Sequence, residues 1–142
     1  MKREIKFRGW GKEREKWFCG ELISDPVEGE DPIISYYADE DDEWYTGWAS
    51  EKVYEESVGQ FTGIKDIKGR EIYEGDYLRG GRGEGVLKDV TLKVIWDNDN
   101  CRYALINFDE EGCIDKLFML SKWMMDNFQL EVVGNEWESD QP

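Results

Sequence analysis

Several groups of residues have the types and spacing that chemistry requires. Glycines crowd the run Gly80-Gly81-Arg82-Gly83-Glu84-Gly85, a composition that can cradle a phosphate. Neither a Walker lysine pattern nor an amphipathic helix follows this run, and a chain of formal net charge −15 repels phosphate. We therefore predict a connection between strands at this place.

A second group offers hard oxygen ligands. The run Asp97-Asn98-Asp99-Asn100 has the side chains that calcium prefers. An EF-hand loop starting at Asp97 would need glycine at its sixth position and glutamate at its twelfth, and Arg102 and Phe108 stand there instead. The run is more typical of a hairpin tip.

Carboxylate pairs form the third group, because glycosidases and two-metal enzymes use such pairs. The pairs lie within 39–43 and 109–111 and at Glu74 with Asp76, but 33 acidic residues produce pairs of this kind by chance. The chain has no histidine, which excludes imidazole metal sites and histidine-based nucleophile activation. We predict no enzyme, no cofactor and no metal site, with a carboxylate-based metal-dependent enzyme as an alternative.

The three cysteines, Cys19, Cys101 and Cys113, lack CxxC spacing and are odd in number. They indicate neither a zinc site nor a disulfide framework, and they fit a reducing cytoplasm. No apolar run reaches the ~20 residues of a membrane-spanning helix, and the charged start MKREIKFRGW lacks the apolar region of a signal peptide. We expect a soluble cytoplasmic protein with no membrane partner.

Charge limits the partners. Eighteen basic residues against 33 acidic ones remove the electrostatic attraction that supplies most non-specific nucleic-acid affinity, so direct nucleic-acid binding is not expected. Carboxylates can instead occupy the positions at which a DNA-binding protein binds the phosphates of DNA. An acidic DNA mimic, using the run ADEDDE at 38–43, is therefore an alternative function.

Large aromatic side chains are the remaining candidates for a binding surface. Seven tryptophans in 142 residues serve a core or a protein interface more often than a stacking platform for bases or sugars. The candidate interaction surface comprises Trp10, Trp44, Trp48, Phe61, Tyr73 and Tyr77.

Short strands must position these residues. Alternation or β-rich composition predicts strands at 3–10, 17–23, 32–37, 71–73, 90–96, 101–108, 113–118 and 129–134. Repeated strands at this spacing indicate a small antiparallel barrel or sandwich. Residues 120–128 predict one short helix or a loop, and residues 44–58 are compatible with an irregular stretch or a short helix.

The central stretch GQFTGIKDIKGREIYEGDYL, residues 59–78, reads as a folding motif. Lys68-Gly69 and Gly75-Asp76 offer turns whose glycines accept positive φ, with extended segments between them. We expect Gly69 and Gly75 to serve as turn residues and the apolar residues of the stretch to pack inward.

The chain resembles the YopX-like family of phage and prophage proteins. The similarity lies in the starting strand REIKFRGW, in the central stretch GQFTGIKDIKGREIYEGDYL and in the closing segment LEVVGN at 130–135. The resemblance implies an all-β, self-associating phage-type protein with an SH3-like barrel in its C-terminal half, and it supplies no catalytic positions. After Asn135 the chain departs from the family pattern, because Glu136-Trp137-Glu138-Ser139 follows.

Together these observations predict an all-β protein of short antiparallel strands with at most one short helix. An N-terminal β-hairpin region with an acidic loop, 1–58, would pack on the central motif and SH3-like barrel, 59–135, and a polar tail, 136–142, would follow. We predict a non-enzymatic, homo-oligomeric protein-binding module with a host or phage protein partner.

Overall fold

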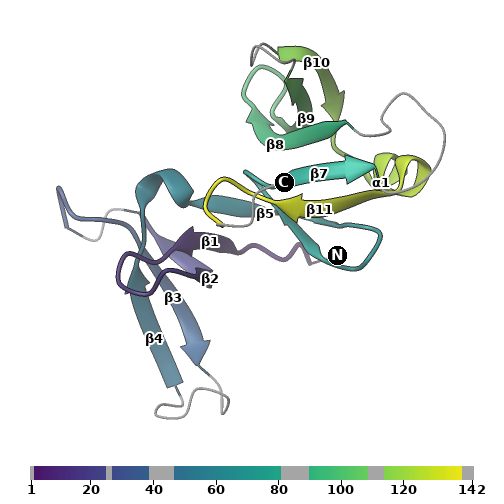
Figure 1. Ribbon diagram of the computed structural model, residues 1–142. Helices are drawn as coiled ribbons and strands as arrows, with labels where there is room; N and C mark the ends of the chain where they lie inside the picture. The colour runs from purple at the N-terminus through teal and green to yellow at the C-terminus, as the bar shows by residue number, and fades with distance from the viewer. Residues whose placement is uncertain (1, 25–26, 39–46, 81–89, 109–113, 139–142) are drawn as a thin grey trace. The chain divides into compact units, whose positions relative to one another are not determined.

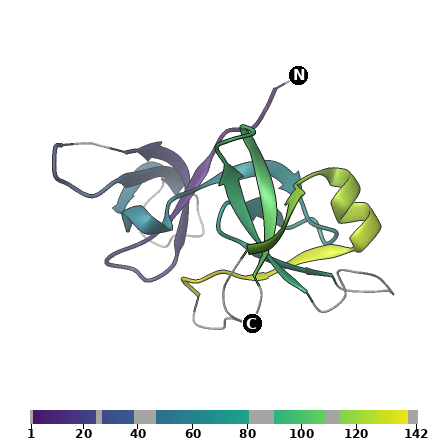
Figure 2. The same cartoon turned by 90° about the horizontal axis from the view of Figure 1, so that it is seen from above.

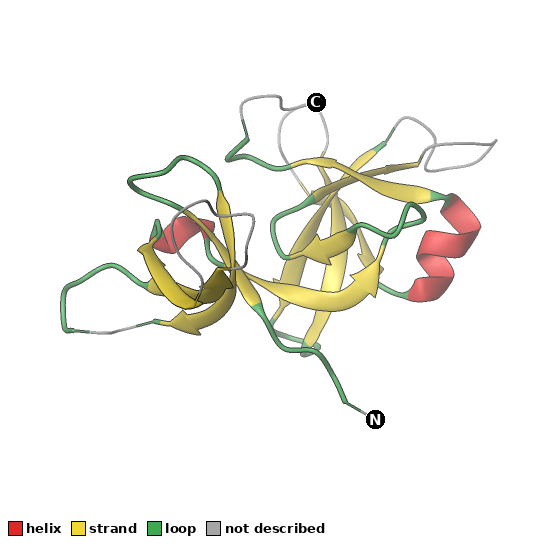
Figure 3. Ribbon diagram, turned by 90° about the horizontal axis from the view of Figure 1, so that it is seen from below, coloured by secondary structure: helices red, strands yellow, loops and turns green. Residues whose placement is uncertain are grey.

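The structure, a computed structural model, describes residues 2–24, 27–38, 47–80, 90–108 and 114–138. These residues form two antiparallel sheets, one of six strands and one of five, with one short α helix and one 3-10 turn. Strands dominate the drawing by secondary structure (Figure 3). The predicted β fold with a single short helix is therefore confirmed at the level of a mostly-β protein.

The elements are labelled in Figure 1. In chain order they are β1 (Phe7–Trp10), β2 (Trp17–Ile23), β3 (Ile33–Ala38), β4 (Gly47–Lys52), η1 (Glu55–Ser57), β5 (Gly59–Lys65), β6 (Glu71–Tyr73), β7 (Tyr77–Gly80), β8 (Thr91–Asp97), β9 (Arg102–Phe108), β10 (Ile114–Met119), α1 (Lys122–Phe128) and β11 (Leu130–Gly134). The order in the six-stranded sheet is β4-β3-β2-β1-β5-β6, and in the five-stranded sheet it is β10-β9-β8-β7-β11.

The chain divides into two compact units, Met1–Phe61 (unit 1) and Thr62–Pro142 (unit 2). Unit 1 is built on the meander of β1 to β4. Its core comprises Phe18, Ile34 and Val53, with Phe7, Leu22, Tyr36 and Val58 packed against them. Because side chains alternate between the two faces of a strand, one face of this meander is committed to the core and the other is left for other uses.

Unit 2 has the larger core, which lies between the five-stranded sheet, Ile72 of β6 and α1. The Ser121 side chain accepts a hydrogen bond from the amide of Met124 and thereby caps α1, whose Met124 and Met125 are buried. Gln129 then adopts a left-handed conformation, φ 52°, and the chain enters β11 directly (Figure 2). The core also contains Leu78, Leu92, Val94, Leu105, Leu120, Leu130 and Val132.

A closed SH3-like barrel is not detected. In the five-stranded sheet of the described residues, β10 and β11 are the two outer strands, and no ladder joins them. The SH3-like barrel expectation is therefore confirmed only at the level of a five-stranded antiparallel sheet.

The central motif is held by two buried aspartates. Asp66 Oδ1 accepts hydrogen bonds from the amides of Lys68 and Arg70, and Asp66 Oδ2 accepts one from the amide of Val132 in β11, each at 2.9 Å. Asp76 Oδ2 accepts a hydrogen bond from the amide of Tyr73 at 2.8 Å. These carboxylates fasten turns and a strand, so in this structure they have an architectural role.

The expected turn residues are confirmed. Gly69 has φ 81° and Gly75 has φ 94°, conformations that glycine adopts without steric cost. The turn at Gly69 joins β5 to β6, and the turn at Gly75 joins β6 to β7.

Two local predictions are confirmed only in part. The first predicted strand, 3–10, forms as β1 from Phe7 onward, and Ile5 before it is exposed. Within 44–58, Glu55–Ser57 form the short 3-10 helix η1, but Gly47–Lys52 form the strand β4, which was not expected. Pairing with β3 along its whole length explains why β4 is extended.

Candidate functional site

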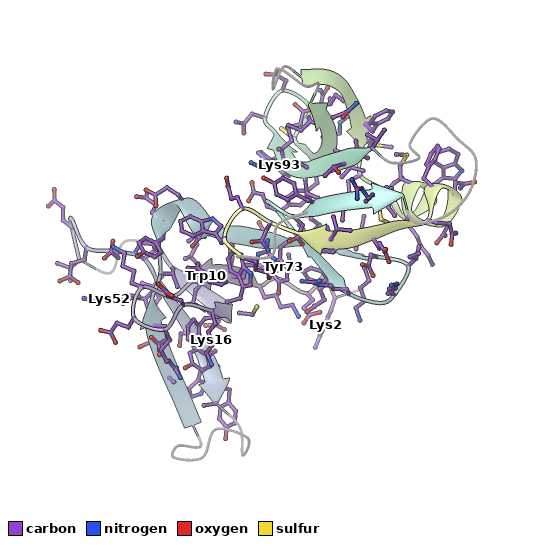
Figure 4. All side chains as sticks on the ribbon, viewed as in Figure 1. Lys2, Trp10, Lys16, Lys52, Tyr73 and Lys93 are labelled. Atoms are coloured by element: carbon purple, nitrogen blue, oxygen red, sulfur yellow. The ribbon has the colours of Figure 1, made fainter. Side chains whose placement is uncertain are left out.

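The six predicted surface residues differ widely in burial. Phe61 and Tyr73 are 3% and 4% exposed, and Trp10 and Tyr77 are half-buried. Trp44 lies outside the described residues. Trp10 pairs with Trp17 across the β1–β2 ladder, with ring centroids 5.2 Å apart. Trp10 and Tyr73 are labelled in Figure 4. Only Trp48, 61% exposed, presents most of its ring to solvent.

Trp48 belongs to an exposed aromatic pair. The β3–β4 register places Tyr37 opposite Trp48, and their rings meet edge to face at a centroid distance of 5.8 Å. Tyr37 is 58% exposed. The pair lies on the face of the sheet opposite the core, because Ile34 and Tyr36 point to the core and Tyr37 follows Tyr36 in the strand.

The same outward face carries further apolar side chains. The ladders align Ile23 of β2 with Ile33 of β3 and Ile33 with Lys52 of β4. Ile23 is 46% exposed. This outward apolar face, defined by Ile23, Ile33, Tyr37 and Trp48, therefore crosses three strands, and exposed groups of this kind mark interaction sites more often than isolated exposed residues do.

Strand β4 is an outer strand of its sheet. The amide of Val53 donates to the carbonyl of Pro32 at 3.0 Å, so the Pro32–Val53 pair is a hydrogen-bonded one. Because such pairs alternate in antiparallel ladders, Glu51, Ala49 and Gly47 direct their backbone groups to β3, whereas Lys52, Ser50 and Trp48 direct theirs away from it. The Lys52 carbonyl accepts a hydrogen bond from the amide of Lys12, which confirms the outward direction.

The turn between β1 and β2 covers only one end of this free edge. Arg14 donates from Nε and Nη2 to Glu51 Oε1 at 3.1 and 2.6 Å, and the hydrogen bond with Glu51 raises the pKa of Arg14. Lys12 Nζ lies 2.7 Å from Asp31 Oδ1, and this hydrogen bond raises the pKa of Lys12. The backbone groups of Trp48 and Ser50 that point outward receive no bond from the residues described here.

A pocket of about 210 Å³ borders the free edge. It is lined by Glu13 of the β1–β2 turn, by Ile33 of β3 and by Ser50, Glu51 and Lys52 of β4. Figure 4 shows Lys52 projecting from this outer strand. The site therefore offers aromatic rings at one end of β4, a partly acidic pocket at the other and unpaired backbone groups between them.

Cations cover other aromatic rings of unit 1. Arg8 lies over Trp17 at 4.1 Å, Lys6 over Phe61 at 5.1 Å and Lys12 over Tyr54 at 5.1 Å, and Arg14 and Lys16 both lie over Phe18. No cation of the described part of the chain lies over Tyr37 or Trp48. Among the described residues of unit 1, the exposed Tyr37–Trp48 pair thus lacks the cation contact that Phe18, Trp17, Tyr54 and Phe61 make.

Of the runs considered as candidate ligand sites in the sequence, the run 97–100 lies within the described residues and has a structural role. Asp97 accepts hydrogen bonds from the Asn100 side chain at 2.8 Å and from the amide of Asp99 at 3.2 Å. The Asn100 hydrogen bond is the main cause of a lowered Asp97 pKa, and both contacts belong to the β8–β9 turn. Glycines 81, 83 and 85 and the acidic run 39–43 lie outside the residues described.

Within the described ranges, no group of three or more histidine, cysteine, aspartate or glutamate side chains is arranged to hold a metal ion. In the same ranges, no helix has the length and apolar character needed to cross a membrane.

Sequence reasoning selected Trp48 but missed Tyr37, Ile23 and the free edge. A register of β3 against β4 would have paired Tyr37 with Trp48, but residues 44–58 did not predict a strand. The alternation of exposed and half-buried residues in GWASEK becomes apparent only once its partner is known.

Comparison with protein families gives one match. The model described as YopX protein matches residues 6–141, which is nearly the whole chain. The chain therefore belongs to the YopX family, a phage-associated family of unknown function. No curated protein matches it.

Proposed function

We propose that this member of the YopX family is a non-enzymatic protein-binding module, and that its binding site is the free edge of β4 together with the outward apolar face. The observation that carries the proposal is the Tyr37–Trp48 pair, more than half exposed on an outer strand. Tryptophan and tyrosine are enriched among the residues that dominate protein interfaces. A partner that covers both rings removes apolar area from water, at about 25 cal/mol per Å².

The absence of histidine from the chain supports a binding role over catalysis, because it removes the commonest general base and metal ligand. The alternative of a DNA mimic rests on charge alone, since the run 39–43 lies outside the described residues. The partner in this proposal is a protein of the phage or of its bacterial host, and binding takes place in the host cytoplasm.

Site-specific crosslinking tests the binding site. A photoreactive amino acid at position 50, expressed in the bacterial host, should give discrete crosslinked species, because Ser50 is exposed and beside Trp48 on the free edge. The substitution Trp48→Ser should remove these species. The same photoreactive group at Glu28, which is exposed in unit 1 away from the sheet strands, is the control and should give none. Crosslinks from position 50 that persist unchanged in Trp48→Ser would refute the proposed site.

Self-association is proposed through a different strand. Leu117 and Met119 lie on one face of the outer strand β10 and are 44% and 54% exposed. The strand IDKLFM carries one acidic and one basic residue, so two copies can pair along it without the like-charge repulsion that a net charge of −15 creates elsewhere. Pairing of two such edges would cover both of them.

Light scattering tests the oligomeric state. We expect a species larger than the 16.7 kDa monomer at micromolar concentration and a monomer for Leu117→Lys combined with Met119→Lys. A wild-type monomer would refute self-association and would leave the β4 site to its own crosslinking test.

A further inference from the structure

Resting on the proposed function of the β4 site, we propose that β4 binds an extended cationic segment of a partner protein, which joins the sheet as an additional strand. The segment would place a lysine or arginine over the Tyr37–Trp48 pair and a second basic side chain beside Glu13. Three independent features of unit 1 lead to this partner: the free backbone groups, the uncovered aromatic pair and the pocket.

The backbone supplies the first feature. Both N–H and C=O of Trp48 and of Ser50 point away from β3, and the described residues leave them open. An extended peptide can bond to these groups in the way one strand bonds to the next. The Lys12–Lys52 hydrogen bond closes the edge just beyond Ser50, so the added strand is short and its position along β4 is defined.

The aromatic pair supplies the second feature. Basic side chains lie over Phe18, Trp17, Tyr54 and Phe61, at 4.1 to 5.2 Å from their ring centroids. Tyr37 and Trp48 have each other and no such cation from the described residues. A partner strand beside β4 would carry its own side chains next to Trp48, and a cationic one would complete the arrangement seen at the other rings.

The pocket supplies the third feature. Side chains two residues apart on a strand share a face and are separated by about 6.7 Å, so a segment with a basic residue opposite Trp48 has its next side chain of that face near Ser50. The pocket lies there, and Glu13 lines it without a hydrogen bond or ion pair to another described residue. Glu51 is already occupied by Arg14, so Glu13 is the carboxylate available to the second basic side chain.

Charge favours this partner over a second copy at the same edge. Two copies of a chain with net charge −15 repel each other, whereas a cationic segment is attracted, more strongly at low salt.

Synthetic peptides test the proposal on the full chain. The probe is a nine-residue blocked peptide that alternates valine with lysine, and the comparison peptides carry serine or glutamate in place of lysine. Amide hydrogen exchange is read residue by residue. We expect the lysine peptide to slow exchange at Trp48 and Ser50 at least tenfold, with no change at Leu117 and Met119 of the outer strand β10, and the glutamate peptide to have no effect.

Two variants separate edge pairing from ring contact. Ser50→Pro removes an amide that points away from β3, so the β3–β4 ladder keeps its bonds and the unit should fold while peptide binding is lost. Trp48→Leu should weaken lysine-peptide binding about fivefold or more. The matched control is Trp123→Leu, because Trp123 is 62% exposed on α1 and should leave binding unchanged.

The outcomes are distinguishable. Equal protection by the serine and lysine peptides would overturn the cationic partner while keeping a protein-binding edge. Protection of Trp48 and Ser50 without any peptide, lost on dilution, would assign the edge to a second copy and overturn the inference. Binding of the lysine peptide without protection of the Trp48 and Ser50 amides would overturn the inference, and so would binding retained by a folded Ser50→Pro variant. Either result would show that the peptide binds by charge at another surface.

Discussion

The central motif of unit 2 and the β3–β4 hairpin of unit 1 use their conspicuous side chains in opposite ways. In the motif, Asp76 belongs to a candidate carboxylate pair in the sequence, yet Asp76 and Asp66 are both buried and accept hydrogen bonds from backbone amides. In the hairpin, Trp48, which was predicted to be a surface residue, and Tyr37 are both turned to solvent. Carboxylates that are buried and bonded to backbone amides indicate an architectural role, whereas exposed aromatic residues on an outer strand are the basis of the proposed binding site.

The largest effect expected from this comparison is on the motif. Asp66→Ala removes three hydrogen bonds to a charged acceptor and leaves the amide of Val132 without its partner, so unit 2 should lose about 3 kcal/mol of unfolding free energy. Urea unfolding followed by circular dichroism measures the loss. Asp126→Ala, at an exposed position of α1, should change stability by less than about 0.5 kcal/mol. Equal stability of the two variants would contradict the architectural role of Asp66.

The next effect concerns a close backbone approach in unit 1. A Cβ at Gly20 would overlap the carbonyl oxygen of Ser35 on the neighbouring strand, so Gly20→Ala should cost about 2 kcal/mol by forcing β2 from β3. Gly29→Ala meets no atom within 4 Å, so it should cost less, even with φ 83°. Thermal unfolding of both variants gives the comparison, and a smaller effect at Gly20 would show that the sheet of unit 1 adjusts freely.

A smaller effect is expected at the turn of the motif. Gly69 has φ 81° and open space around it, so Gly69→Ala should cost about 1 kcal/mol from backbone conformation alone. Gly69→Val should cost more, because a β-branched residue tolerates positive φ poorly. If Gly69→Val folded with wild-type stability but lost partner binding, the motif would be a binding site and the comparison of the two regions would fail.

The smallest effect depends on pH. The pKa of Asp97 is lowered, chiefly by the hydrogen bond from Asn100, so its ionised form is favoured in the folded state. The resulting stability is present above the unfolded pKa of about 3.9 and is lost as pH falls through the folded pKa. Wild type should therefore exceed Asp97→Asn in urea midpoint at pH 7, and the difference should shrink toward pH 3. A difference in urea midpoint that stayed constant from pH 7 to pH 3 would show that the charge of Asp97 does not contribute to it.

Much of unit 2 could be predicted from the sequence because its signals are local. Residues 90–96 and 101–108 are rich in β-branched and aromatic residues around a four-residue turn, and β8 and β9 form there. The turns at Gly69 and Gly75 were likewise predictable, because few residues besides glycine adopt such φ values. The pairing of β7 with β11 was harder to predict, because it depends on how strands distant in the chain meet.

The candidate site was harder to predict because its signals are not local. GWASEK has low β propensity, and it becomes a strand through its pairing with β3. Trp48 could be selected as an aromatic residue, but its partner Tyr37 follows from a register that the sequence does not reveal. Phe61 and Tyr73 were selected by the same reasoning as Trp48, and their burial shows that residue type alone does not predict exposure.

Hydrogen exchange at two amides tests whether the free edge of β4 binds a partner. We expect the amides of Trp48 and Ser50 to exchange rapidly in the isolated protein, since they point away from β3, and to be protected at least tenfold when the lysine peptide is bound. Equal exchange rates of these two amides with and without the saturating peptide would contradict binding at this edge.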